Sequence, residues 1–407
     1  MAGSVTMTST QSTEHELLRI CANYELSETA LETIRRIAGN ANWDYVEKTA
    51  WKHGLVPLLY RNLSRACPDL VPMPVLSRLG QAYVANAAHN LRLTGELLRI
   101  IDILKAAGIQ AVPFKGPVLA DFLFGNVALR QFSDIDILIR QGDVRKAKHL
   151  LLADGYRSEF DLNPKSENEY IRSEHAFQLR KQNLGFVVEL HWRFGSRNQL
   201  FPVKSSEIRS RLLQRTFQGG DILTLCREDL LLYLCAHGAK HGWERLEWIA
   251  CVCQLIRLPD QIDWDAVMDR AGRRGARRAL YVGLLLAGEL SQLVIPEAVS
   301  EAMFSDPAAR ALAHQARSCL FKEQPDHSRR EVYRQTYYLR TRERLFDRAR
   351  ILLYCSARIP HPLAKDWSLF RIPAGMSFLY YLLRPLRLLR DHGFRGLRAM
   401  LDPNTTF

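Results

Sequence analysis

Apolar residues recur at helical spacing in the first and last parts of the chain and alternate with polar residues in between. From residue 14 to residue 90 the intervals are three and four, which predicts a small group of amphipathic helices separated by proline turns. Residues 91–107 continue this spacing up to Gly108, a residue type that commonly ends a helix. Residues 1–13 are small and polar, and we expect them to form a disordered tail.

The segment after Gly108 predicts a mixed α/β unit, because short apolar or alternating runs take turns with short helical stretches. A helix is expected to begin at Pro117, after a turn formed by Lys115 and Gly116. The last two predicted strands are close enough to form a hairpin. The runs that predict strands are residues 109–114, 132–140, 177–180 and 186–192.

Helical spacing returns from residue 228 onward, and prolines interrupt the last part of the chain. The pattern therefore predicts an α+β protein whose central mixed-sheet core is flanked by N- and C-terminal helical regions. The expected divisions are a tail at residues 1–13, a helical region at 14–90, the α/β core at 91–220, and a helical region with a basic segment at 221–407.

The composition is that of an ordinary globular protein, with 47% hydrophobic and 24% charged residues in a chain of 407. It excludes a disordered, collagen-like or low-complexity chain. The net charge of +13 is concentrated near the C-terminus, where residues 329–400 hold 16 Arg and Lys against 5 Asp and Glu. This excess indicates either an anionic partner or a solvated helical face with ion pairs.

The basic segment contains an amphipathic stretch in which Arg384, Arg387 and Arg390 share one helical face. One interpretation is contact with a membrane surface or a nucleic acid. The other, which we favour, is a helix that docks on the core by its apolar side. Nucleic acid and peripheral membrane contact are therefore alternative partners and not the favoured ones.

The eight cysteines are scattered, most of them in apolar runs, which predicts buried free thiols and a reducing compartment. Residues 1–13 lack the apolar segment of a signal peptide. The longest apolar stretch is too short to cross a bilayer. We therefore expect a cytoplasmic protein without a transmembrane segment.

Two pairs of polar residues in the predicted strands carry the candidate chemistry. Asp134 and Asp136 lie two residues apart, so in a strand both carboxylates project from one face. Glu189 and His191 share a face in the same way. Adjacent carboxylates repel each other unless a cation lies between them, and Mg²⁺ prefers carboxylate oxygens. The spacing favours a magnesium site over the alternative of a solvated strand end.

The turn at Lys115 and Gly116 has features of a phosphate-binding turn. Glycine lets a phosphate approach the backbone, and the start of the following helix offers N–H groups and the positive end of a dipole. Lys115 can add a positive charge. Taken alone, the turn is better explained as a tight connection with a solvent-facing lysine.

The order of these residues resembles the DNA polymerase β-like nucleotidyltransferase superfamily and, more closely, a family of uncharacterised bacterial nucleotidyltransferases. The resemblance rests on Lys115-Gly116, Arg130, the Asp134/Asp136 pair and the later run of Glu189, His191 and Trp192. It extends over residues 15–392. In two positions the chain departs from the expected pattern, with Pro117 in place of a serine and Cys251 in place of an aspartate.

The resemblance implies transfer of a nucleoside monophosphate from a nucleoside triphosphate, ATP above all, to an acceptor that the sequence leaves open. It implies that Mg²⁺, or Mn²⁺ in its place, is held by three carboxylates that also act in catalysis, with Glu189 as the base. Gly116 would pack the triphosphate and Lys115 and Arg130 would neutralise it. Ser133 and His191 are expected beside the nucleotide. The metal-binding and catalytic residues are Asp134, Asp136 and Glu189.

Two alternatives stay open. One is a degenerate nucleotidyltransferase fold that binds a nucleotide or a partner without catalysis. The other is an enzyme that adds nucleotides to RNA through the basic C-terminal region, whose affinity for RNA would fall steeply with salt.

Overall fold

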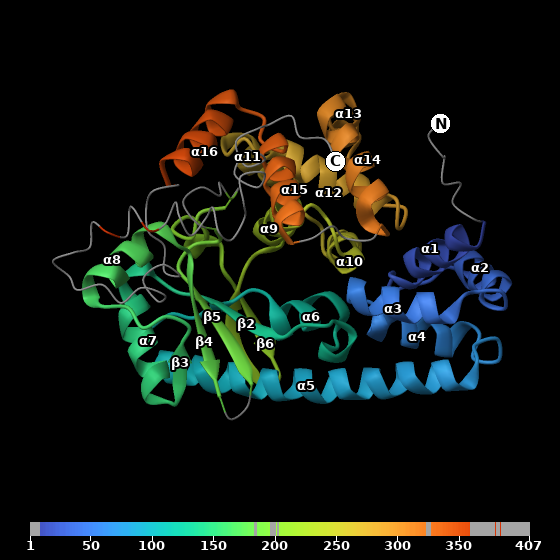
Figure 1. Ribbon diagram of the computed structural model, residues 1–407, viewed down its shortest axis with the longest axis horizontal. Coiled ribbons are helices and arrows are strands. Elements are labelled where there is room, and N and C mark those ends of the chain that lie inside the picture. The colour runs from blue at the N-terminus through green and yellow to red at the C-terminus, as the bar shows by residue number, and fades with distance from the viewer. Residues whose placement is uncertain are drawn as a thin grey trace.

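A five-stranded mixed sheet lies beside a long helix, with further helices above and to one side (Figure 1). The computed structural model describes residues 9–182, 185–195, 201, 203–322, 327–358, 379 and 383. The strand order is β1-β2-β5-β4-β3, in which only the β2–β5 pair is parallel. This mixed sheet among helices confirms the predicted α+β class. The strands are β1 (Val112–Pro113), β2 (Asp134–Leu138), β3 (Tyr156–Ser158), β4 (Ala176–Lys181) and β5 (Phe186–His191).

The parallel pair β2–β5 is in a register that joins the two polar motifs. Asp136 lies opposite Glu189, and the backbone partner of Asp134 is Val187. Directly paired residues project from the same face of a sheet, so the carboxylates of Asp136 and Glu189 lie on one side. The alternate residues, such as Ile135 and Val188, are fully buried on the other side. Burial of that apolar face fixes the register.

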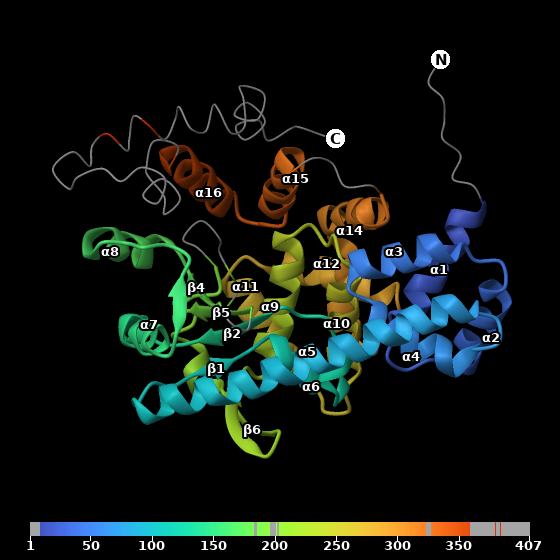
Figure 2. The same cartoon turned by 60° about the horizontal axis from the view of Figure 1, so that its bottom comes forward.

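One helix, α5 (Met73–Ala106), extends along most of the length of the molecule (Figures 1 and 2). Its 34 residues correspond to about 50 Å at 1.5 Å per residue. It passes through residue 90 without a break, where the sequence pattern suggested a division. Val75 packs in a core with the other N-terminal helices, whereas Leu97 and Leu104 pack in a second core under the sheet.

The N-terminal and C-terminal helices share the first of these two cores. Hydrogen bonds join them, from the Leu246 N–H to His53 Nδ1 at 3.2 Å and from the Asn23 side chain to the Leu290 carbonyl at 3.1 Å. The helices outside the sheet are α1 (Ser9–Cys21), α2 (Glu28–Ala38), α3 (Trp43–His53), α4 (Val56–Ala66), α9 (Arg227–Lys240), α10 (Leu246–Arg257), α11 (Trp264–Arg273), α12 (Arg277–Gly288), α13 (Glu297–Ser305), α14 (Pro307–Leu320), α15 (His327–Arg340) and α16 (Leu345–Arg358).

Shorter elements connect the strands. Three of them were not expected from the sequence: β3, helix α8 and the hairpin β6–β7. β6 is mostly exposed and β3 contributes a single buried residue, so neither has the apolar alternation that marks a strand. These elements are α6 (Gly116–Phe124), α7 (Val144–Ala153), α8 (Pro164–Ser173), β6 (Leu213–Phe217) and β7 (Gly220–Thr224).

Several expectations can be compared with the described residues. Helix α1 begins at Ser9, earlier than the end of the expected tail. Of the seven cysteines whose side chains are described, six are buried and all are free thiols. None of the described helices is long and apolar enough to cross a membrane. The face formed by Arg384, Arg387 and Arg390 lies outside the described residues.

A buried ion-pair network on α5 ties this helix to the sheet and predicts acid sensitivity. The Glu96 carboxylate accepts hydrogen bonds from Arg99 on its own helix and from Lys181 on β4. Burial alone would raise the pKa of Glu96, but the hydrogen bonds from Arg99, Tyr156 and Lys181 lower it to about 2.

We expect Glu96→Gln to lower the free energy of unfolding at pH 7 by about 1–3 kcal/mol, because charged hydrogen bonds are lost. The stabilisation exists above the pKa of the unfolded chain, near 4.3, and is lost as the pH falls toward 2. The difference between variant and wild type in urea denaturation should therefore shrink between pH 5 and pH 2. Glu32→Gln, at an exposed position on α2, is the control. A pH-independent difference would contradict the prediction.

Candidate active site

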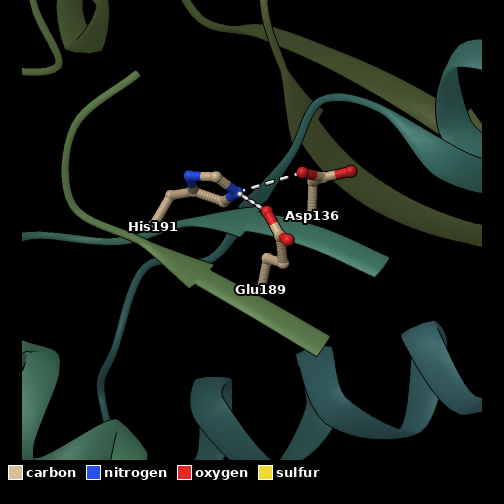
Figure 3. Close-up of side chains that lie close together, drawn as sticks. All are labelled: Asp136, Glu189 and His191. Atoms are coloured by element: carbon tan, nitrogen blue, oxygen red, sulfur yellow. Dashed lines mark hydrogen bonds and ion pairs between the residues drawn. The ribbon is translucent and has the colours of Figure 1, made fainter. Parts of the chain in front are cut away.

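Three side chains from β2 and β5 meet above the centre of the sheet (Figure 3). The imidazole Nε2 of His191 lies 3.0 Å from Asp136 Oδ1 and 3.2 Å from Glu189 Oε2. One potential ligand atom from each residue lies within 4.8 Å of the others. The register of the parallel pair is what brings these side chains together, since Asp136 and Glu189 are direct partners.

Lys115 adds a second positive group to the same carboxylate. Its Nζ lies 2.8 Å from Asp136 Oδ1, the oxygen that also faces His191. The other oxygen, Oδ2, is buried and has no hydrogen-bond partner among the described residues. Asp136 is only 1% exposed, whereas the Glu189 side chain is 30% exposed. One carboxylate is thus sealed inside the fold and the other is partly exposed to solvent.

Opposite charges determine the protonation states of the Asp136, Glu189 and His191 side chains. Burial alone would raise the pKa of Asp136, but the charge of Lys115 and the hydrogen bond from His191 hold it below its usual value. Burial would also raise the pKa of Glu189, but the hydrogen bond and charge of His191 outweigh burial and lower this pKa. For His191, burial is outweighed by the two carboxylates, which raise the pKa. Both carboxylates are therefore ionised at neutral pH.

Asp134 and Ser133 lie at the start of β2, at the edge of this group. Burial, followed by the charge of Asp136, raises the pKa of Asp134 to about 6. Asp134 is close enough to Asp136 and Glu189 to feel their charges, but it is outside the three-residue group. Ser133 is exposed. Among the described residues, His191 completes the group with Asp136 and Glu189, and the metal-binding role of Asp134 stays a prediction.

The conformation of Gly116 explains why the turn requires glycine. Its φ is +55°, in the left-handed region, and a Cβ at this position would lie 2.9 Å from the backbone oxygen of Asp134. The turn therefore packs directly against β2, and this contact holds Lys115 beside Asp136. The expected contact between Gly116 and a triphosphate stays a prediction.

Arg130 is held by a carboxylate of the protein itself. Its Nη2 lies 2.9 Å from Oε1 of Glu247 on α10, and the two side chains are 11% and 5% exposed. The side chain of Asn90 on α5 holds the Arg130 carbonyl at 2.8 Å. Cys251 lies beside the guanidinium, and burial raises the pKa of its thiol to about 11. Arg130 also feels the charge of Asp134, and this position is compatible with the predicted contact between Arg130 and phosphate.

Helix α9 contributes residues that the sequence did not single out as part of the site. Tyr233 lies beside Lys115, and its ring packs on Phe114 at 5.2 Å between centroids. Lys240 is about two turns further along the helix. Burial and the charge of Lys115 lower its pKa to about 8. The apolar run around Tyr233 is typical of a core helix. The only signal for a polar face of α9 in the sequence is the spacing of Tyr233, His237 and Lys240 at intervals of four and three residues.

Two histidines lie at the end of α9, His237 within the helix and His241 directly after it. The His237 and His241 rings lie 4.7 Å apart, and both contact Trp248. Burial lowers the pKa of both, so they are neutral. They are not part of the metal-competent group found among the described residues. His175, 5.7 Å from His191 between ring centroids, also lies near the site.

The fold agrees with what comparison with known families shows. A family model described as uncharacterised nucleotidyltransferase matches residues 39–292, which is more than half of the chain. The protein belongs to this nucleotidyltransferase family. No curated protein and no solved structure matches the chain.

The close contact at Gly116 predicts a specific cost of substitution. We expect Gly116→Ala to lower the free energy of unfolding by about 1–3 kcal/mol, because the backbone is in the left-handed region and the new Cβ meets the β2 backbone. Gly39→Ala is the matched control, since Gly39 has a φ of −62° and open space around its Cα. Urea denaturation of both variants measures the difference. Equal stability of the two would contradict the contact.

Proposed function

We propose that this protein transfers a nucleoside monophosphate from a nucleoside triphosphate, ATP in the first place, to a hydroxyl group of an acceptor, with Mg²⁺ or Mn²⁺ as cofactor. The single observation that carries the proposal is the Asp136 carboxylate. It is buried, ionised and paired at one oxygen only, beside a second ionised carboxylate, Glu189. Membership of a nucleotidyltransferase family supports the same reaction class.

The residues present fit a divalent cation. Asp136 Oδ2 has no hydrogen-bond partner among the described residues. The other oxygen of this carboxylate, Oδ1, lies 2.8 Å from Lys115 Nζ. His191 has a raised pKa and faces both carboxylates, so it acts as a hydrogen-bond donor and leaves oxygen atoms as ligands. Oxygen ligands suit Mg²⁺ and Mn²⁺. Asp136 and Glu189 would hold the ion, with Asp134 at the edge.

Such a cation, when bound, supplies charge stabilisation at the α-phosphate of the nucleotide. In the reaction the acceptor oxygen forms a bond to the α-phosphorus. The bond between this phosphorus and the oxygen bridging to the β-phosphate breaks, and pyrophosphate leaves. The proton of the acceptor hydroxyl passes to an oxygen of Glu189, the more exposed carboxylate.

Positive side chains around the carboxylates perform the remaining tasks. Lys115 lies at the start of α6, where backbone N–H groups and the helix dipole also favour phosphate. It can donate hydrogen bonds to the β- and γ-phosphates. Arg130 is positioned by Glu247 and adds positive charge near Asp134. His191 fixes the orientation of both carboxylates.

Substitution of the two carboxylates tests the catalytic proposal. We expect Asp136→Asn and Glu189→Gln each to lower the rate of nucleotide transfer at least 100-fold, because each removes a charge at the reacting centre. Transfer is followed by mass spectrometry of products formed in a lysate supplied with α-labelled ATP and the purified protein. Excess EDTA should abolish it. Asp161→Asn, outside the site, should leave the rate unchanged.

A rate that is unchanged in Asp136→Asn would overturn the catalytic proposal. If the wild type forms no product but binds ATP, the alternative of a nucleotide-binding protein without catalysis gains support.

Metal binding can be measured separately from transfer. We expect Mn²⁺ titration, followed by electron paramagnetic resonance, to give at least tenfold weaker binding for Asp136→Asn than for wild type, because the buried ligand loses its charge. The Asp161→Asn protein is again the control. Equal Mn²⁺ affinity of wild type and Asp136→Asn would contradict the assignment of Asp136 as a ligand.

A further inference from the structure

A cavity of about 740 Å³ opens beyond the ends of β2 and β5. Arg140, two residues after β2, lines it, and so do Trp192 and Arg193, directly after β5. The same two strands carry Asp136 and His191. Four extended residues span at most about 13 Å, so the cavity lies within the length of a nucleotide of the candidate active site.

The other walls of the cavity are strongly basic. Arg273 and Arg274 come from the end of α11, and Arg350 comes from α16. Together, eight Arg and Lys side chains line the cavity against a single carboxylate, Asp347. Its volume is typical of a site for a small ligand. The accumulated charge predicts a ligand with several negative charges.

Three of these cations are not held in an ion pair by the described residues. Arg140, Arg209 and Arg350 form no ion pair with a carboxylate within the described part of the chain, whereas Arg274 pairs with Glu207. Arg209 is held in place by a hydrogen bond to the side-chain oxygen of Gln110 at 2.5 Å. Burial and the charge of Arg140 lower the pKa of Arg209, as expected where like charges face each other.

We propose that this cavity binds the phosphate groups of a small phosphorylated acceptor and directs the acceptor hydroxyl toward Asp136 and Glu189. The proposal rests on the nucleotidyl transfer proposed above and names the acceptor class. Guanidinium groups bind phosphate through paired, charge-assisted hydrogen bonds, and three of them here are not in an ion pair with a carboxylate of the described residues. A cavity of this volume holds a molecule about the size of a nucleotide, which favours a small acceptor over a nucleic acid strand.

Isothermal titration of the full chain with inorganic pyrophosphate tests the cavity. The buffer contains EDTA and no nucleoside triphosphate, so the result does not depend on nucleotide transfer. We expect the wild type to bind, and Arg140→Ala/Arg209→Ala to lose at least tenfold in affinity. The single variant Arg140→Ala, at an exposed position, should lose about tenfold in affinity for pyrophosphate. It replaces the double variant in the test if the double variant does not fold.

The matched control is Arg78→Ala/Arg317→Ala, which removes the same charge from two arginines outside the cavity that pair with Glu47 and Glu289. It should bind pyrophosphate like the wild type. Equal losses in both double variants, or none in Arg140→Ala/Arg209→Ala, would overturn the proposal. So would a wild type that binds a 12-nucleotide RNA but not pyrophosphate. Pyrophosphate binding without any nucleotide transfer would overturn only the proposed function.

Discussion

The buried charge of Asp136 is the constraint on which the site and much of its surroundings depend. A carboxylate with 1% exposure is stable in its ionised form only if positive groups reach it. Lys115 reaches it from the turn before α6, and His191 reaches it from β5. The first contact requires the turn to lie against β2, which only Gly116 allows. The second requires the parallel register that places β2 beside β5.

A second layer of paired charges supports the first. Arg130 and Glu247 neutralise each other at the boundary between α10 and the loop before β2. Because Asn90 on α5 binds the Arg130 carbonyl, this loop is fixed by two helices from distant parts of the sequence. The entrance to the carboxylates therefore has a rigid frame. Preorganised charges of this kind are what phosphoryl chemistry requires of a protein.

The sequence allowed the main strands and their shared polar face to be predicted, because period-two alternation around Asp134 and Asp136 is a local signal. It did not reveal that Glu189 is the direct partner of Asp136, since strand pairing depends on the whole sheet. It also did not identify Tyr233 or Lys240, which lie in a run whose apolar neighbours are typical of a core helix. The residue pattern supplied most of the candidate residues and the resemblance to a family added Arg130 and Ser133, but their contacts came only from the fold.

The local sequence pattern also did not predict that α5 is one continuous helix, for a related reason. Its spacing is helical on both sides of residue 90, but the two halves are buried in different cores. A division there was suggested by the change from helices to strands further along, not by a signal in the helix itself. Which core a residue belongs to depends on tertiary packing. Leu97, for example, belongs to the second core only because the strands pack over it.

The core shared by the first and last helices has a consequence for how the chain folds during synthesis. Residues such as Leu17 and Leu59 are buried together with Leu255 and Leu312, more than 190 residues later. The early helices therefore leave the ribosome long before the segments that cover them, and their apolar faces stay open to solvent until then. Contacts this distant in sequence slow folding and leave apolar surface of the nascent chain exposed for longer.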